Sequence, residues 1–282
     1  MLNRLIELAN QQGLLLGVTS KEKYEKYTEL NEMYKYANSI ITFAMPIERG
    51  NGIMASYALS KDYHLVLKEK LSYIANTLNL KRFDICVDTE PISDKLCALT
   101  SGLGFIGKNS LIITSKGSFV MLGEIVTDLE LEQGEQIQTS CGTCTLCEVA
   151  CPSKAIGNVY ENCIAGWLQR KIVLTDSQFE MFDTIYGCDI CQNVCPFNKG
   201  VQTKEVYTYE NIDILDIIKC SKKEFYKYKE VAFYWLGHNV VKRNIIVYAA
   251  NKGIDIDSHI QYVNSKEEYM LAAIDYYWRK KR

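Results

Sequence analysis

Eight of the eleven cysteines lie between positions 141 and 195, and their spacing is typical of ligands to iron–sulfur clusters. The first run, Cys141–Pro152, reads C-x2-C-x2-C-x3-C-P, in which three thiolates hold one 4Fe–4S cube and the fourth cysteine reaches a second cluster. A second, incomplete run follows over Cys188–Pro196. Because such clusters carry single electrons, the sequence predicts redox chemistry.

The two runs divide their ligands between two clusters. Because the fourth cysteine of a run ligates the other cluster, each cluster draws on both runs. The second run lacks its first cysteine, since Ile185 occupies that position, and Cys163 is the remaining cysteine between the runs. We therefore expect one cluster to be held by Cys141, Cys144, Cys147 and Cys195, and the other by Cys151, Cys163, Cys188 and Cys191.

A disulfide framework and a zinc site are the alternative roles for these cysteines, and both fit the sequence less well. A disulfide framework is typical of small secreted chains, and the N-terminal residues show no signal-peptide core. A zinc site uses paired knuckles rather than a four-cysteine run that proline closes. We therefore expect a reducing, cytoplasmic location. Outside the runs, Cys86, Cys97 and Cys220 are expected to be buried small residues.

Composition indicates an ordinary globular protein of about two domains. The chain has 282 residues, of which 48% are hydrophobic and 23% charged, and its formal net charge is −2. Bulk charge therefore gives no attraction to nucleic acid or to an anionic membrane. The longest apolar stretches, Ile40–Ile47 and Val120–Val126, are too short to span a bilayer. We expect no membrane association and a monomeric protein.

Three regions follow one another along the chain. Residues 1–135 alternate helix and strand signals, which is typical of an α/β sheet domain. Residues 136–200 are predicted to be a ferredoxin-like domain with two 4Fe–4S clusters, in which the stretch 164–186 is helical. Residues 201–282 are predicted to be a short helical region that would accommodate helix pairs of HEAT type. The expected fold class is therefore mixed, α+β or α/β, with a helical C-terminal region.

Periodicity gives the elements of the first region. Apolar residues with helix or strand spacing are separated by turns that contain glycine. The predicted elements are a helix over 2–12 that ends at Gly13, a strand over 39–45, a helix over 62–78, a strand over 82–88, and a hairpin of 111–114 with 119–126 that turns at Lys116-Gly117.

A second group of candidate functional residues follows the predicted strand over 82–88. Asp88-Thr89-Glu90-Pro91 stands at the carboxyl end of that strand, where open α/β sheets place their ligands. Gly104 and Gly107 permit close approach of a ligand to the backbone, and Lys108-Asn109-Ser110 offers hydrogen-bond donors beside them. The alternative is a tight turn with a solvated lysine, and spacing alone does not decide between a ligand site and such a turn.

Five segments together form a recognisable set: Lys61–His64, Asp88–Pro91, Gly102–Asn109, the first cysteine run and Tyr186–Gln192. The set, in this order, resembles the epoxyqueuosine reductase family over most of the chain from about residue 40 to residue 200. The resemblance implies a cobalamin-dependent oxidoreductase with two 4Fe–4S clusters. It further implies reduction of the epoxide of epoxyqueuosine, at the wobble position of tRNA, to queuosine.

The resemblance also implies roles for particular residues. Asp88 matches the proton donor to the departing oxygen, and we expect burial against the corrin to raise its pKa. His64 is a weaker candidate for a cofactor contact, because a histidine in a helical stretch is more often packed against its neighbours than bound to a metal. The expected cobalamin contacts are Tyr57, Asp88, Gly107, Lys108, Asn109 and Ser110.

The C-terminal region departs from the family pattern. The family carries a longer HEAT-like region, and basic residues of its tRNA-binding segment are replaced here by Leu236, His238 and Asn239. Fewer phosphate contacts would weaken tRNA binding and its salt dependence. The expected tRNA contacts that remain are Lys242, Arg243 and Asn244.

Two further functions stay open on the sequence alone. A cobalamin and iron–sulfur reductase of a small molecule would fit the less basic C-terminal region. An electron carrier without a substrate site would need only residues 136–200, but it would leave Asp88 and the Gly107–Ser110 segment without a role. For the tRNA enzyme, a flavodoxin or a ferredoxin is the expected electron donor.

Overall fold

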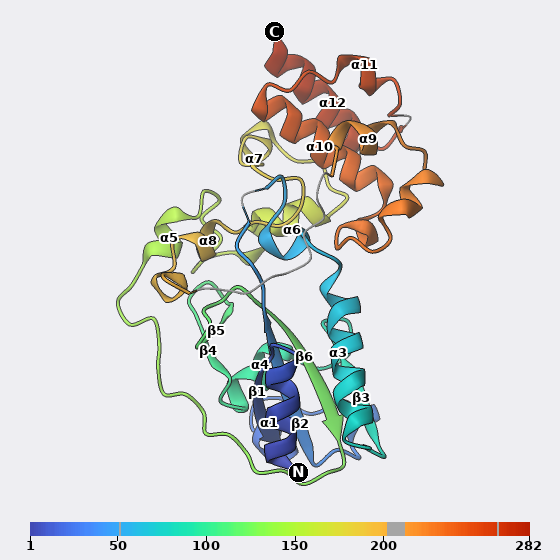
Figure 1. Ribbon diagram of the computed structural model, residues 1–282. Helices are drawn as coiled ribbons and strands as arrows, with labels where there is room; N and C mark the ends of the chain where they lie inside the picture. Colours follow the sequence, from blue (N-terminus) through green and yellow to red (C-terminus); the bar gives the residue numbers. More distant parts are fainter. Residues whose placement is uncertain (51, 202–211, 264) are drawn as a thin grey trace. The chain divides into compact units, whose positions relative to one another are not determined.

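The structure is a computed structural model that describes all residues except 51, 202–211 and 264. The described chain divides into two compact units (Figure 1). The first unit contains Met1–Glu48, Tyr63–Thr145 and a short segment that begins at Cys195, and the second contains Arg49–Asp62, Leu146–Val194 and the C-terminal helices. The first unit is mixed α/β and the C-terminal region is helical, as predicted.

The centre of the first unit is a sheet of β1 (Leu15–Ser20), β2 (Ser39–Pro46), β6 (Val120–Thr127) and β3 (Phe83–Cys86), paired in that order. Every pairing is antiparallel. β2 is buried along almost its whole length, which explains its continuous apolar sequence. The predicted strands over 39–45 and 82–88 are confirmed as β2 and β3.

Helices cover both faces of this sheet: α1 (Leu2–Gln11), α2 (Lys21–Glu25), α3 (Tyr63–Thr77) and α4 (Asp94–Thr100), with single 3-10 turns at Glu32–Tyr34 and Pro196–Asn198. α3 contacts β3 and β6, where Gly123 faces Leu71. α4 contacts β1, β2 and β6, and Ala98 packs in one cluster with Val120. Because successive strand residues point to opposite faces, Glu124 lies on the face that α4 covers.

The predicted hairpin between 111–114 and 119–126 is wrong. β5 (Ile112–Thr114) pairs with β4 (Gly104–Ile106), whereas β6 joins the four-stranded sheet. Thr114 and Gly117 form reciprocal backbone hydrogen bonds, which make a tight turn between β5 and β6. β6 then matches β2 in length over its full register, so it buries more apolar surface there than a three-residue partner would allow.

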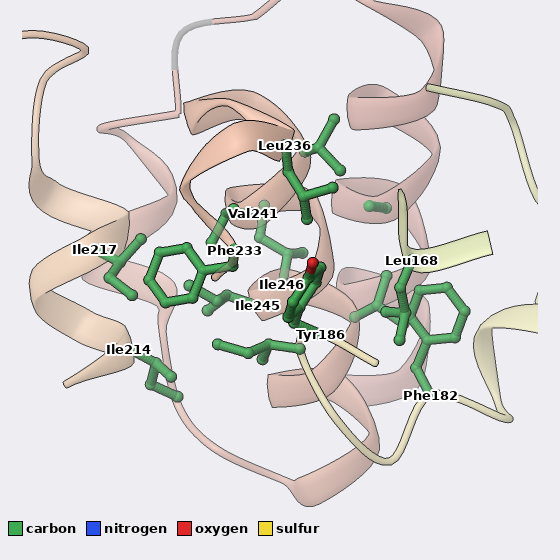
Figure 2. Packing of buried hydrophobic residues seen from close by; sticks show 14 of the residues in the cluster. Leu168, Phe182, Tyr186, Ile214, Ile217, Phe233, Leu236, Val241, Ile245 and Ile246 are labelled. Carbon is green, nitrogen blue, oxygen red and sulfur yellow. The ribbon is translucent and has the colours of Figure 1, made fainter. Parts of the chain in front are cut away.

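The second unit consists of helices around one apolar core, to which Leu168, Tyr186, Phe233 and Ile245 contribute (Figure 2). None of the helices in the described ranges is long and apolar enough to cross a membrane. The helices are α5 (Leu146–Ala150), α6 (Ile164–Gln169), α7 (Asp176–Phe179), α8 (Ile190–Asn193), α9 (Ile214–Lys219), α10 (His238–Lys252), α11 (Asp257–Ile260) and α12 (Glu268–Lys281), with 3-10 turns at Ser56–Ala58, Tyr160–Asn162, Glu224–Tyr228 and Tyr234–Leu236.

The helix predicted over 164–186 is present only in part. α6 ends at Gln169, because the backbone of Arg170 is extended, and α7 begins after a capping box formed by Thr175 and Gln178. The residues between, Lys-Ile-Val-Leu-Thr, include β-branched side chains that disfavour a helix. The apolar pattern therefore predicts one helix where the chain forms two short ones.

Candidate functional site

The first unit contains Cys141, Cys144 and Cys195. The Cys144 N–H donates to the Cys141 carbonyl at 3.1 Å, so one turn presents both thiols. The Lys108 backbone N–H donates to Cys141 Sγ at 3.5 Å, and Lys108 Nζ donates to the Cys144 carbonyl at 2.9 Å. The predicted cofactor loop therefore contacts the first cysteine run directly.

Asn198 fixes the segment that carries Cys195. The Ser118 N–H donates to Asn198 Oδ1 at 2.7 Å, and Asn198 Nδ2 donates to Ser118 Oγ at 2.9 Å. Gly117 has a φ of +73°, and a Cβ atom there would overlap Asn198 Oδ1. Burial raises the pKa of Cys195, and negative charge on Cys141 and Cys144 raises it further. Cys195 therefore lies near both, as expected for ligands of one cluster.

The second unit contains the other five cysteines of the two runs and their connection. α5 and α8, which carry Cys147 and Cys191, pack against each other. Burial raises the pKa of Cys188 to about 11, and negative charge on nearby Cys163 and Cys151 contributes to the rise. Cys151, Cys163 and Cys188 are members of the predicted second ligand set, so their proximity agrees with that set.

The environment of the thiols suits iron–sulfur ligation. Burial acts against ionisation of Cys151, but hydrogen bonds from Ser153 and from backbone N–H groups lower the pKa of this thiol overall. All eleven cysteines lie in the described part of the chain, and none forms a disulfide there. No three His, Cys, Asp or Glu side chains among the described residues are close enough to hold a single metal ion. The donor set is one of thiolates with backbone N–H donors, which fits 4Fe–4S clusters.

Asp88 follows β3 and has a positive φ of 63°. Tyr63 Oη, at the start of α3, donates to Asp88 Oδ2 at 2.8 Å, and His64 Nε2 lies 3.5 Å from the same oxygen. The rings of Tyr63 and His64 stack with their centroids 4.0 Å apart. Because the sheet is antiparallel, the rule for open parallel sheets does not place this carboxylate. Its left-handed loop and these two side chains do.

In the protein alone the pKa of Asp88 is lowered, and the expected rise on burial against the corrin stays a prediction. The interaction with His64 is the largest influence and lowers the pKa; burial opposes it, and the hydrogen bond from Tyr63 lowers it further. The side chain is 60% exposed, so water stabilises the charged form. A raised pKa would require a group that covers this carboxyl and excludes water.

The loop Gly107–Ser110 joins β4 to β5 in a tight turn. The Ser110 N–H donates to the Gly107 carbonyl at 2.9 Å, and Ser110 has a φ of +62°. A Cβ atom at Gly107 would meet Ile113 Cδ1 at 2.7 Å and Asn109 Oδ1 at 2.8 Å, so a larger residue there would displace these two side chains. Asn109 is buried, and its Nδ2 has no hydrogen-bond partner among the described residues. A buried donor of this kind fits a loop that binds a polar cofactor.

Tyr57 belongs to the second unit, apart from the other predicted cofactor contacts in sequence and in unit. Its ring meets the Tyr186 ring edge-on with the centroids 5.5 Å apart. A Cβ atom at Gly187 would lie 2.8 Å from the Tyr57 ring. Next to it, Ser56 N–H and Oγ each donate to Asp189 Oδ2 at 2.6 Å. The Tyr186–Gln192 motif thus fixes Tyr57, whose contact with a cofactor stays a prediction.

The structure gives Arg243 and Asn244 a role other than the predicted contact with tRNA. Both side chains are completely buried. Arg243 Nη2 donates to the Trp167 and Arg170 carbonyls at 3.0 Å, and Asn244 Nδ2 donates to the Leu168 carbonyl at 2.8 Å. These carbonyls end α6 and need donors from elsewhere. Burial lowers the pKa of Arg243 to about 10. The prediction that these two side chains bind RNA is therefore wrong.

Lys242 is also buried but lies beside a cavity. Its Nζ donates to the Tyr262 carbonyl at 3.3 Å, and burial lowers its pKa. The cavity has a volume of about 350 Å³, and Lys219, Lys222 and His238 line it as well. Of the three predicted tRNA contacts, Lys242 is the one whose charge adjoins a cavity.

Two residues near Asp88 were not identified from the sequence. Tyr63 stands in the Lys61–His64 motif, but a tyrosine at the start of an apolar helix gives no signal of its partner. Glu124 interrupts the apolar run Val120–Val126, and an acidic residue inside a buried strand was a signal that could have found it.

Two family models match the chain. Residues 28–89, which include Tyr63 and Asp88, match the model described as "Epoxyqueuosine reductase QueG, DUF1730". Residues 140–198, which include all eight predicted ligands, match the "4Fe-4S double cluster binding domain". A domain for two 4Fe–4S clusters therefore occupies the region between the predicted α/β and helical regions.

Curated relatives named epoxyqueuosine reductase align with most of the chain. The protein of Lactococcus garvieae is 34% identical over 250 residues, which cover 81% of this chain and 71% of that protein. The protein of Staphylococcus aureus is 32% identical over 80% of this chain and 64% of its own length. That of Bacillus subtilis is 34% identical over 71% of this chain and 56% of its own length. The alignment with the last two thus spans less than two thirds of the relative.

Solved structures agree over the whole described fold. A selenomethionine-labelled epoxyqueuosine reductase superposes with a TM-score of 0.81 at 25% identity, over 99% of this chain and 98% of that chain. An epoxyqueuosine reductase in complex with a tRNA-Tyr epoxyqueuosine-modified stem loop superposes with a TM-score of 0.83 at 28% identity. The match covers 98% of this chain and 89% of that chain. With both family models, these relatives and this fold in agreement, the chain belongs to the epoxyqueuosine reductase family of iron–sulfur oxidoreductases.

Proposed function

We propose that this protein reduces the epoxide of epoxyqueuosine in tRNA to queuosine, in the cytoplasm and as a monomer. One observation supports this most strongly: the backbone N–H of Lys108, in the predicted cofactor loop, donates to Sγ of the predicted cluster ligand Cys141 at 3.5 Å. This hydrogen bond joins an electron-carrying site to a cofactor loop in one unit. Backbone N–H bonds to cluster thiolates also occur in simple electron carriers, so it is the other predicted contacts of this loop that favour a reductase.

The reaction sets what the protein must supply. Two C–O bonds break, a C=C bond forms, and the oxygen leaves as water, which consumes two electrons and two protons. We propose that a flavodoxin or a ferredoxin supplies the electrons to the two clusters. One cluster would be held by Cys141, Cys144, Cys147 and Cys195, and the other by Cys151, Cys163, Cys188 and Cys191.

Cobalamin is the cofactor that we propose for the Gly107–Ser110 loop. When bound, it supplies a cobalt centre that reduction makes strongly nucleophilic. Gly107 lets the loop turn without a side chain in the way, and the unpartnered, buried Asn109 Nδ2 is a donor that a polar cofactor can satisfy. Lys108, Ser110, Asp88 and, from the second unit, Tyr57 are the further proposed contacts.

Asp88 is the proposed proton donor to the departing oxygen. Its Oδ2 is held by the Tyr63 hydroxyl and lies near His64, so the carboxyl has a fixed direction before substrate arrives. Because the carboxyl is ionised in the protein alone, it must gain a proton when cofactor and substrate cover it and exclude water. His64, the neighbouring titratable group, is placed to pass that proton on.

The three regions have distinct proposed tasks. Residues 1–135 bind the cofactor and carry Asp88, residues 136–200 hold the clusters, and residues 201–282 support them and contribute to binding of tRNA. Lys242, with Lys219 and Lys222 at the same cavity, is the proposed source of positive charge for RNA. A small-molecule substrate is the second candidate, because the burial of Arg243 and Asn244 removes two groups from the surface that RNA could reach.

Turnover of epoxyqueuosine-containing tRNA tests the proposal. The protein is purified anaerobically, reconstituted with iron, sulfide and cobalamin, and supplied with a chemical reductant; queuosine is measured in the digested tRNA. We expect queuosine that disappears when cobalamin is omitted. In Asp88→Asn we expect both cofactors to bind while turnover falls by on the order of 100-fold or more. The matched control is Asp84→Asn on β3, an exposed carboxylate that Tyr36 binds, and it should be unchanged.

A different result would redirect the assignment. Full activity in Asp88→Asn would exclude the proton-donor role. Bound, reducible cobalamin without any queuosine would support the small-molecule alternative, and absence of cobalamin binding would contradict the cofactor proposal.

A further inference from the structure

Glu124 is a fully buried carboxyl group in the middle of β6. Its register partners are Thr42 on β2 and Cys86 on β3. Among the described residues, neither carboxyl oxygen of Glu124 has a hydrogen-bond partner, and the Thr42 hydroxyl has none either. An ionised carboxylate without a donor is very costly in such a place. This group therefore needs a proton or a partner that carries one.

Asp94 is that partner. It is the first residue of α4, the helix that covers the face of the sheet on which Glu124 lies, and its own Oδ1 is buried without a donor. Burial raises the pKa of Asp94 to about 6, although the neighbouring Glu124 carboxyl lowers it. Burial, followed by the charge of Asp94, raises the pKa of Glu124 well above its usual range. Two carboxyl groups can form a hydrogen bond only if one of them is protonated.

The pair is joined to the loop that carries Asp88. The backbone of Asp88 lowers the pKa of Asp94, which places it beside that carboxyl. One residue earlier, the Val87 N–H donates to Glu90 Oε2 at 2.7 Å, and Glu90 is held in turn by Lys68 Nζ at 2.8 Å. Carboxyl groups thus lie beside two successive residues of a loop whose Asp88 has the unfavourable positive φ.

We propose that Glu124 and Asp94 share one proton, and that this pair is a positioning element for Asp88. Protonated Glu124 donates to Asp94, whose carboxyl is then free of repulsion and accepts the Asp88 N–H. The left-handed turn at Asp88 is thereby held, and its side chain is aimed at Tyr63. The role in catalysis depends on the proposed function, whereas the shared proton does not.

The surroundings of the pair make it sensitive to pH. Loss of the shared proton would place two negative charges among groups that are themselves acidic or neutral, and repulsion would release the Asp88 N–H. The described cations that act on this region include Lys68, bound to Glu90, and Lys95, which acts on Asp88, as His64 also does when it is protonated. The other titratable groups that face the pair are Tyr24 from α2, Cys86 from β3, Asp88 and Glu90 from the loop, and Cys97 from α4.

The shared proton can be tested on the complete protein without cobalamin or tRNA. The infrared band of a protonated carboxyl should be present in the wild-type protein near neutral pH and absent in Glu124→Gln. Hydrogen exchange of residues 87–90 should accelerate by on the order of 10-fold in Asp94→Ala, because the acceptor is lost. In Glu124→Gln it should stay slow, because the amide still donates to Asp94. Absence of the carboxyl band, or unchanged exchange in Asp94→Ala, would overturn the proposal.

Turnover then tests the positioning role. In Asp94→Ala we expect kcat to fall by roughly 10- to 100-fold with KM little changed, because the donor is displaced while binding is kept. Glu124→Gln should retain activity within about 3-fold and lose the alkaline decline that deprotonation of the pair produces. An unchanged pH profile in Glu124→Gln would refute the role. If neither wild type nor variants form queuosine while the band and the exchange behave as expected, the proposed function fails and the shared proton stands.

Discussion

The hydroxyl of Tyr63 donates a 2.8 Å hydrogen bond to Oδ2 of Asp88, from the first turn of α3 to the loop after β3. With His64 as the larger influence, this bond holds the pKa of Asp88 below its ordinary value. The carboxylate is therefore directed and ionised at the same time. A donor prepared in this way gains its proton only when its surroundings change.

Tyr63→Phe should move the pKa of Asp88 upward, toward the ordinary value of about 3.9. The sign follows from the bond: a lowered pKa stabilises the folded protein above the titration range of the unfolded carboxyl, and this contribution is lost as pH falls through the folded pKa. The variant should lose less stability on acidification. The measurement is a carbon-13 NMR titration of labelled aspartate. An unchanged midpoint would mean that His64 alone sets the pKa.

Gly117→Ala should disturb iron binding without touching a cysteine. The added methyl group would overlap Asn198 Oδ1, and the backbone has a positive φ, so the Cys195 segment must shift. We expect loss of about half of the iron and sulfide, because one of two clusters loses a ligand. Gly200→Ala is the matched control, since its φ is +74° and no described residue has an atom within 4 Å of the added one. Equal iron content in both variants would exclude the anchoring role of Asn198.

Cys163→Ala should remove the second cluster and leave the first. Cys163 precedes α6 and its charge acts on Cys188, which is the structural support for its place as the eighth ligand. Iron analysis and electron paramagnetic resonance of the reduced protein should show one cluster instead of two. Cys220→Ala, in the buried core of the same unit, should retain both. Retention of both clusters in Cys163→Ala would require another eighth ligand.

Asn244→Leu should destabilise the protein rather than its complex with RNA. The substitution leaves the Leu168 and Ile185 carbonyls without their donor, at a cost of about 1–3 kcal/mol for each unsatisfied group. Thermal unfolding should therefore occur at a lower temperature, while the salt dependence of tRNA binding stays the same. Lys280→Gln, which removes an exposed ion pair with Glu180, is the control for stability. A smaller salt slope in Asn244→Leu would restore it as an RNA contact.

The sequence predicted the chemistry of this protein better than its topology. The cysteine spacing is a local property, so the ligand set could be written down without knowledge of the fold. The strand that pairs with β6 could not be predicted in this way, because a turn at Gly117 is compatible both with a hairpin and with a strand that joins another sheet. Only the length match between β6 and β2, a long-range property, decides between them.

The errors at Arg243 and Asn244 have a similar origin. A basic residue and an amide in a helix look alike in sequence whether they face RNA or the end of another helix. The decision depends on the three carbonyls at the end of α6, more than seventy residues away. The lowered pKa of Asp88 in the protein alone likewise depends on a different element, which carries Tyr63 and His64.

The hydrogen bonds from Arg243 and Asn244 to the end of α6 bear on how this protein could be shortened. Cys163 stands at the beginning of α6, and α10 satisfies the carbonyls at its other end. A fragment cut at residue 200 would keep every predicted ligand but would lose the helix that holds one of them in place. We therefore expect a chain shortened past α10 to hold the proposed second cluster less well, whatever happens to RNA binding.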